Sequence, residues 1–122
     1  MPSDLIRLMQ SLFPTAADAV RSALWQPAVD VYRTRTGWLV KAELAGVRPE
    51  DIRLTVAGNR LSIQGSRRDW LSEQGCCHYR MEISYSQFER VLELPCDLDK
   101  AHITTEYQYG LLLVRVETEA EK

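Results

Sequence analysis

The sequence lacks the features that mark several common classes of protein. Only three of its 122 residues are cysteine, and an odd number of thiols does not form a disulfide framework. No apolar run approaches the length of a membrane span, and the N-terminus has no basic stretch followed by an apolar one, as a signal peptide would. We therefore expect a cytoplasmic protein with no membrane span.

Charge of one sign is not in excess either. Fifteen basic residues are balanced by 17 acidic ones, which leaves a formal net charge of -2. Nucleic-acid binding needs a surplus of Lys and Arg on one face, so we expect no nucleic-acid partner. With 45% hydrophobic and 26% charged residues, the chain has the composition of a globular protein, and its length suits one domain.

The residues able to carry chemistry form no catalytic or metal-binding pattern. Cys76, Cys77 and His78 are adjacent, but no Cys-x-x-Cys or His-x-x-x-His pair accompanies them. We expect three reduced thiols and no cofactor, with a regulatory disulfide at Cys76 or Cys77 as the alternative. His102 is accompanied by no Ser nucleophile elbow and no Gly-rich phosphate loop. We therefore expect no enzymatic activity.

Residues 1–26 have the period of a helix. Their first part places five apolar residues on one helix face, namely Leu5, Leu8, Met9, Leu12 and Phe13. Pro14 interrupts this helix, and a second short helix is predicted after it. Two interpretations stay open. These helices either pack on their own domain or form a mobile apolar arm that binds other chains.

From Pro27 onward the period changes to that of β-strands. Apolar and polar residues alternate in short segments at 29–32, 40–44, 52–56, 61–65, 88–94, 102–107 and 111–116. Turn residues separate them, and Gly58-Asn59 and Tyr109-Gly110 are predicted as two-residue hairpin turns. About seven strands with no helix between them predict an all-β fold, an immunoglobulin-like antiparallel β-sandwich preceded by the short helical arm.

Several stretches carry a more specific pattern. They are Ala42-Glu43-Leu44-Ala45-Gly46-Val47, Pro49-Glu50-Asp51-Ile52, Gly58-Asn59-Arg60-Leu61-Ser62-Ile63-Gln64-Gly65, Phe88-Glu89-Arg90, Leu94-Pro95 and Tyr109-Gly110-Leu111-Leu112-Leu113-Val114. In this order and spacing they resemble the α-crystallin domain of small heat-shock proteins of the bacterial and plant type. Ala45, Ser86 and Tyr109 depart from the Pro, Gly and Asn usual there. The chain then divides into an arm (1–26), an α-crystallin domain (27–117) and a short tail (118–122).

The resemblance implies an ATP-independent chaperone, a holdase that binds partly unfolded proteins and prevents their aggregation. The alternative is a co-chaperone-like β-sandwich that binds one specific folded partner. Such a protein would be expected to lack both the long polar segment at 66–85 and the apolar arm, and their presence favours the holdase.

The resemblance also implies a homodimer formed by strand exchange. Segment 66–85 corresponds to the one that carries the exchanged strand, with Cys77, His78, Tyr79, Arg80, Met81 and Glu82 laid against Val29, Asp30, Val31 and Tyr32 of the other chain. The family arginine matched by Arg90 lies near this dimer contact. The alternatives are a flexible loop at 66–85 and, at Arg90, a solvated strand arginine opposite an acidic neighbour.

A second implied surface is a groove between the strands at 52–56 and 102–107. In the family this groove accepts an Ile-x-Ile/Val motif from a neighbour's tail, and client segments. The candidate lining residues here are Ile52, Leu54, Val56, Ile103 and Thr105, whose alternative role is core packing. No Ile-x-Ile/Val motif follows Val116. We therefore expect a dimer, or a modest assembly held by the arm, rather than a tail-locked shell.

Overall fold

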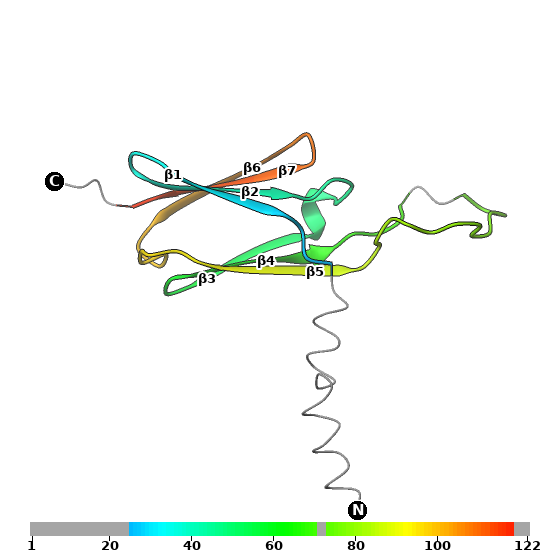
Figure 1. The fold of residues 1–122 in the computed structure, drawn as a ribbon, viewed down its shortest axis with the longest axis horizontal. Helices are drawn as coiled ribbons and strands as arrows, with labels where there is room; N and C mark the ends of the chain where they lie inside the picture. Colours follow the sequence, from blue (N-terminus) through cyan, green and yellow to red (C-terminus); the bar gives the residue numbers. More distant parts are fainter. Residues whose placement is uncertain (1–24, 71–72, 119–122) are drawn as a thin grey trace, which may run out of the picture.

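The strands predicted from residue 27 onward form a two-layered antiparallel sandwich (Figure 1). This computed structural model describes residues 25–70 and 73–118. Its elements are, in chain order, β1 (Val29–Arg33), β2 (Gly37–Glu43), the 3-10 turn η1 (Pro49–Asp51), β3 (Ile52–Ala57), β4 (Arg60–Ser66), β5 (Gln87–Glu93), β6 (His102–Gln108) and β7 (Leu111–Glu117). The predicted β-sandwich is confirmed, and the strand ends differ from the prediction by a few residues at most.

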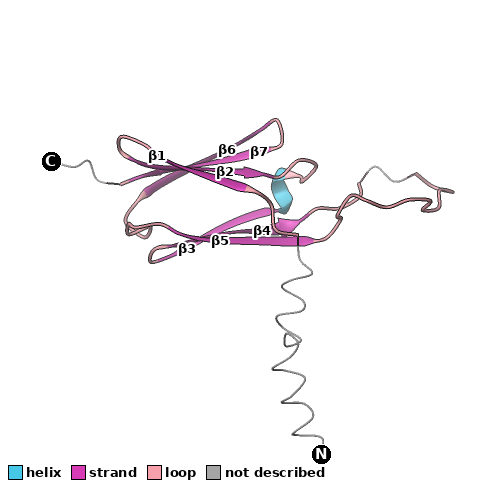
Figure 2. Cartoon of the chain, in the orientation of Figure 1, coloured by secondary structure: helices cyan, strands magenta, loops and turns pink. Residues whose placement is uncertain are grey.

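The two layers differ in width. Figure 2 shows the two sheets as separate layers. One sheet has the strand order β1-β2-β7-β6, and the other has the order β3-β4-β5. Every strand pair in both sheets is antiparallel. Because neither sheet closes on itself, β1, β6, β3 and β5 each have one side without a neighbouring strand among the described residues.

The core lies between the layers because alternation sends every second side chain of the strands inward. The fully buried side chains come from both sheets and from the loops that follow them, and the largest are Phe88, Leu44, Leu61, Ile63, Leu98, Val40, Val114, Val116 and Pro27. Burial of each apolar side chain of this size contributes about 1.5–3 kcal/mol. Contacts between the two layers therefore hold the domain together.

The turn between β6 and β7 forms although a tyrosine stands at its first central position. Tyr109 has φ 55° and Gly110 has φ 76°, so both are left-handed, as a type I′ hairpin turn requires. The Tyr109 side chain is 93% exposed, so packing does not hold it in this conformation. The pairing of β6 with β7 therefore holds the Tyr109 backbone in the left-handed conformation.

Most of the predicted helical arm lies at residues 1–24, outside the described residues. Trp25 is described and already belongs to the sandwich. Its backbone N–H donates to the carbonyl of Gln87 at 3.1 Å, and its ring meets the edge of Phe88 at a centroid distance of 5.5 Å. The contacts of the sandwich thus begin before Pro27, the expected start of the domain.

Candidate functional site

The strand β1 presents an open edge of the four-stranded sheet. Among residues 25–70 and 73–118, its only neighbouring strand is β2. Val29 packs against the core, whereas Val31 and Tyr32 are 41% and 44% exposed. An unpaired edge that carries exposed apolar side chains is a template for a strand from another chain. The edge that was expected to accept an exchanged strand is therefore accessible.

The connection between β4 and β5 projects from one end of the sandwich (Figure 1). Its described parts, 67–70 and 73–86, contain no strand. In the second part, apolar side chains alternate with polar ones over nine residues, with Cys77, Tyr79, Met81, Ile83 and Tyr85 in the apolar set.

The apolar set of this segment is exposed in the single chain. Tyr79 is fully exposed, and Met81 and Ile83 are 51% and 60% exposed. On the polar side, Arg80 and Glu82 approach to 3.4 Å, but both side chains are largely solvated and the pair stabilises little. Alternation of period two is typical of a half-buried strand, so this segment has the pattern of a strand but pairs with no strand in the part of the chain that the structure describes.

The predicted exchange residues are not brought together within one chain. Residues 29–32 lie on β1, and residues 77–82 lie in the projecting segment (Figure 1). The pairing between them stays a prediction about two chains.

Arg90 lies on β5, where it helps to fix the entrance to β1. Its Nη1 donates to the carbonyl of Pro27 at 3.0 Å, and Pro27 is fully buried. Its register partner on β4 is Ile63, so the residue opposite Arg90 is apolar and not acidic. The side chain therefore positions the start of the open edge strand.

A groove lies between β3 and β6, the facing edge strands of the two layers. It has a volume of about 170 Å³ and is lined by Pro49, Ile52, Leu54, Thr105, Glu106, Tyr107 and Leu112. Three of the five predicted lining residues, Ile52, Leu54 and Thr105, line it. Val56 and Ile103 are not among its lining residues. All four apolar residues, Ile52, Leu54, Val56 and Ile103, also pack against the core cluster, the role that the alternative gave them.

Sequence reasoning missed the other lining residues of this groove. From the sequence, Pro49 was part of a family motif only. Tyr107 and Leu112 were assigned to strands without a prediction of the face on which they lie. Alternation of apolar and polar residues with a period of two is a local property of the sequence. It does not indicate which side of an edge strand packs against the opposite layer.

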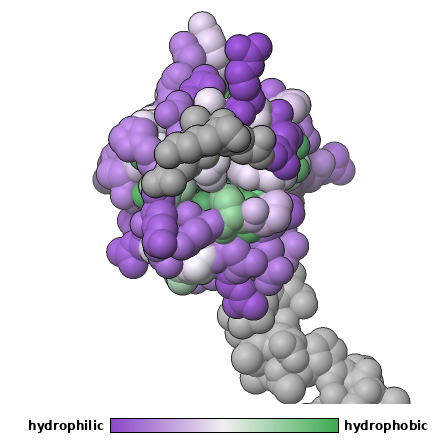
Figure 3. All heavy atoms as spheres, turned by 90° about the vertical axis from the view of Figure 1, so that its left-hand side faces the viewer, coloured by the Kyte–Doolittle hydropathy of each residue, from purple (hydrophilic) through white to green (hydrophobic). Residues whose placement is uncertain are grey.

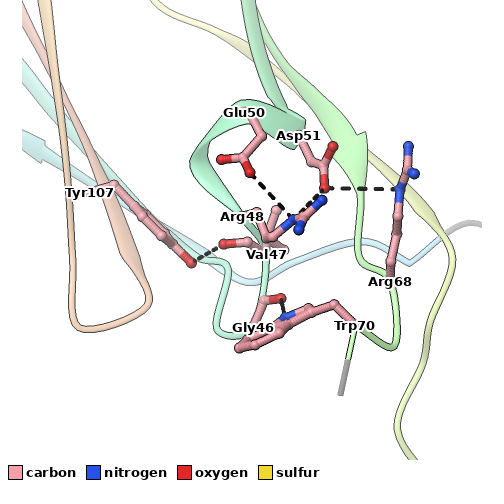
Figure 4. Close-up of polar contacts among 8 residues, drawn as sticks. All are labelled: Gly46, Val47, Arg48, Glu50, Asp51, Arg68, Trp70 and Tyr107. Atoms are coloured by element: carbon pink, nitrogen blue, oxygen red, sulfur yellow. Dashed lines mark hydrogen bonds and ion pairs between the residues drawn. The ribbon is translucent and has the colours of Figure 1, made fainter. Parts of the chain in front are cut away.

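Tyr107 joins the groove to the loop after β2. Its hydroxyl oxygen lies 2.7 Å from the carbonyl oxygens of both Leu44 and Val47, and the contact with Val47 is drawn in Figure 4. Burial raises the pKa of Tyr107 above its ordinary value of 10.0. The hydroxyl therefore keeps its proton for these carbonyls up to alkaline pH.

The same loop contacts the root of the projecting segment (Figure 4). Trp70 donates from Nε1 to the carbonyl of Gly46 at 3.3 Å. The Asp51 carboxylate lies 3.7 Å from Arg48 Nε and 3.9 Å from Arg68 Nε. Residues 44–51 thus connect the groove on one side with the segment on the other.

Arg67 makes several hydrogen bonds at this root, where the projecting segment leaves and rejoins the sandwich. Its Nε donates to the carbonyl of Ser84 at 2.8 Å and its Nη1 to the carbonyl of Ala45 at 3.2 Å, while its backbone N–H donates to Ser86 at 3.0 Å. Arg67 therefore holds the start and the end of the projecting segment together beside the sandwich. Beyond this point a hollow of about 570 Å³ opens between them, with Trp70, Ile83 and Tyr85 among its apolar lining residues.

The remaining surfaces carry fewer features that indicate a function. Seen from the end at which the β1–β2 and β3–β4 turns lie, hydrophobic surface shows between hydrophilic side chains (Figure 3). Among the described residues, no cluster of three or more His, Cys, Asp or Glu side chains could hold a metal ion. In the same part of the chain, no helix has the length and apolar character needed to cross a membrane. Cys76, Cys77 and Cys96 are all free thiols.

Comparison with known proteins identifies the family. The model of the Hsp20/alpha crystallin family matches residues 30–122. Spore protein SP21 of Stigmatella aurantiaca is 33% identical over 86 residues, which are 70% of this chain and 51% of that protein. The 16.9 kDa class I heat shock protein 3 of Oryza sativa is 30% identical over 110 residues, which are 89% of this chain and 74% of that protein.

Solved structures give the same result. A small heat-shock protein from Xylella fastidiosa is 31% identical with a TM-score of 0.66, over 80% of this chain and 90% of that one. The hspA protein of Xanthomonas axonopodis is 29% identical with a TM-score of 0.65, over 80% and 98%. The chain spans about half the length of some curated relatives, 51% of spore protein SP21 and 55% of small heat shock protein C4 of Rickettsia felis. Since the family model covers most of the chain and the sandwich has the same fold, the chain belongs to the Hsp20/alpha crystallin family of small heat-shock proteins.

Proposed function

We propose that this chain is an ATP-independent chaperone that binds partly unfolded proteins and prevents their aggregation. The observation that carries the proposal is the groove between β3 and β6, which is lined in part by Ile52, Leu54 and Thr105. An extended apolar segment of an unfolding protein can bind there by side-chain contact. A non-enzymatic, cofactor-free role fits this surface.

The working unit in this proposal is a homodimer formed by reciprocal strand exchange. Residues 77–82 of each chain pair with residues 29–32 of the other. The strand pattern of residues 77–85 and the open side of β1 support this pairing, because each supplies what the other lacks. Arg90 supports it by holding Pro27, and with it the entrance to the edge strand.

Client segments are proposed to bind in two places. The groove between β3 and β6 offers Ile52, Leu54 and Thr105 to an extended apolar segment. Residues 1–26, with the apolar face that begins at Leu5, are the second place and also the contact that links dimers into larger assemblies. A cytoplasmic location belongs to the same proposal.

The test is suppression of light scattering from a heated client protein without nucleotide. The full chain should suppress it, and added ATP should change nothing. A chain that leaves client aggregation unchanged at several-fold molar excess would refute the proposal and favour a partner-specific binding module.

Variants test which surface of the chain binds client proteins. Leu54→Glu places a charge in the groove and should weaken suppression, whereas Thr55→Glu places the same charge on the exposed face of the same strand and should not. Removal of residues 1–24, which leaves Trp25 on Phe88, should weaken suppression if the arm binds clients. Unchanged suppression by the shortened chain would assign client binding to the sandwich.

Strand exchange is tested by measuring the mass of the assembled protein, which distinguishes dimers from monomers. Met81→Glu charges the apolar side of the segment and should convert dimers into monomers, whereas Arg80→Glu changes the polar side and should leave them intact. Equal masses for the two variants would contradict pairing through this segment.

A further inference from the structure

The hollow at the root of the projecting segment has walls that hydrogen bonds hold in place. Its volume is about 570 Å³, and it opens between the start and the end of the segment. Arg67 donates to the carbonyls of Ser84 and Ala45. Trp70 donates to the carbonyl of Gly46. These polar groups of the wall are therefore satisfied within the chain, and the hollow does not depend on an occupant for its shape.

The hollow presents apolar side chains to solvent. Trp70, Ile83 and Tyr85 line it, and they are 55%, 60% and 39% exposed. An exposed apolar patch of this kind is typical of a surface that another apolar segment covers. The charged side chains of the wall are two basic and two acidic ones, namely Arg67, Arg68, Asp69 and Glu82. Since their charges balance, the hollow favours an apolar occupant over an ion.

Trp25 brings the N-terminal arm to this hollow. Its ring is in cation–π contact with Arg67, a lining residue, at 3.7 Å. Trp25 also forms a parallel bridge with Phe88. In a parallel pair both chains run in the same direction, so the residues before Trp25 lead back beside the residues before Phe88. Those residues include 82–85, which form one wall of the hollow.

The chain just before Trp25 has the side chains to fill an apolar hollow. In the second short helix predicted after Pro14, the residues Val20, Ala23 and Leu24 stand at i, i+3 and i+4 and so share one face. Five residues span about 8 Å as a helix and about 17 Å when extended. Because Trp25 is fixed beside the hollow, residues 20–24 reach it in either conformation.

We propose that this hollow is the docking site for residues 20–24 of the same chain, and that Val20, Ala23 and Leu24 are the side chains that enter it. The proposal rests neither on chaperone activity nor on strand exchange, because both surfaces in contact belong to one chain. It divides the arm into two parts. Residues 20–24 are anchored on the sandwich, and the apolar face that begins at Leu5 is left for other contacts.

The experiment measures how fast hydroxyl radicals oxidise Trp70 in the full chain, followed by peptide mass spectrometry. Leu24→Asp should raise this rate at least about threefold, because a carboxylate is not stable in an apolar hollow and the docked segment is released. Ser22→Asp places the same charge on the opposite face of the predicted helix and should leave the rate unchanged. Tyr109, which is 93% exposed on the β6–β7 turn, is the reference that should react equally in all chains.

A mixed sample tests whether the arm occupies the hollow of its own chain. Nitrogen-15-labelled Leu24→Asp and the unlabelled, unchanged chain are unfolded and refolded together, and mass separates their Trp70 peptides. Trp70 should react fast in the labelled chain and slowly in the unlabelled one. Equal rates in the two chains of the mixture would show that the arm crosses to a neighbour, and would overturn docking within one chain.

Two further outcomes decide the proposal. Equal rates at Trp70 in Leu24→Asp, Ser22→Asp and the unchanged chain would show that residues 20–24 do not cover the hollow. Met81→Glu, which is expected to prevent strand exchange, should keep the slow rate of the unchanged chain. Fast oxidation of Trp70 in Met81→Glu would assign its protection to a second chain. Loss of dimers with slow oxidation would contradict strand exchange alone as the cause of protection and support docking of the arm.

Discussion

The guanidinium carbon of Arg67 lies 3.7 Å from the centre of the Trp25 ring, a cation–π contact between the root of the projecting segment and the residue at which the N-terminal arm joins the sandwich. The same guanidinium group donates to the carbonyls of Ser84 and Ala45. One side chain therefore joins the two parts of the chain for which intermolecular roles are proposed.

Arg67→Ala should lower the free energy of unfolding by about 2 kcal/mol, because it removes a partly buried cation–π contact and two hydrogen bonds. Arg67→Lys should recover less than half of the free energy of unfolding that Arg67→Ala loses. A Lys ammonium group lacks the flat face that stacks on a ring, and it cannot donate in two fixed directions as a guanidinium does. Urea denaturation measures both. Arg68→Ala is the control, because that side chain is 67% exposed and lies 3.9 Å from its carboxylate partner. An equal loss for Arg68→Ala would contradict the role given to Arg67.

Tyr107→Phe should lower the free energy of unfolding by about 1 kcal/mol at neutral pH, because the carbonyls of Leu44 and Val47 lose a donor. Urea midpoints compared with those of the unchanged chain measure this loss. Tyr79→Phe, which alters a fully exposed ring, is the control and should change little.

The same variant should change the dependence of stability on pH. The pKa of Tyr107 is raised in the folded chain, so its contribution is complete below the ordinary value of 10.0. As the pH rises past that value, the unfolded chain loses this proton first and stability falls until the folded hydroxyl titrates. Urea midpoints between about pH 9 and about pH 11 should therefore decline less steeply for Tyr107→Phe. Parallel declines would show that the hydroxyl is not coupled to folding.

Tyr109→Asn should stabilise the domain by about 0.5–1 kcal/mol, because Asn tolerates a left-handed conformation better than Tyr does. The melting temperature should rise by a few degrees. Tyr109→Ala removes the same exposed ring without this advantage and should give no gain. Equal gains from both variants would mean that the ring, and not the backbone angle, is unfavourable.

Gly65→Ala should destabilise the domain by about 3 kcal/mol, the upper end of the usual cost of forcing an extra methyl group into a packed site. A Cβ at Gly65 would meet the carbonyl oxygen of Asp51 and lie 2.7 Å from Cζ of Phe88. Ser66→Ala, at the next position of β4, is the matched control and should cost less than about 1 kcal/mol. Thermal unfolding followed by circular dichroism compares them, and similar melting temperatures would mean that β3 and β4 separate easily here.

The strands were predictable because their signals are local. In β2, β4 and β7 the inward positions recur at every second residue, as at Val40 and Ala42, and turn residues stand between the strands. The family pattern was recognisable for the same reason, since it consists of short stretches in fixed order. Of the residues expected at the groove, Ile52 and Leu54 line it and Val56 and Ile103 do not, although all four pack against the core.

The sequence alone thus determined an all-β sandwich, its turns and its family, because alternation and turn chemistry depend on neighbouring residues. The tertiary structure decided which strands are edges, since the order β1-β2-β7-β6 leaves β1 open and places β6 opposite β3. It also decided that Arg67 meets Trp25, and that Tyr79 and Met81 have a strand's pattern without a strand partner. These are relations between distant parts of the chain, and only packing of the two layers brings such parts together or leaves them exposed.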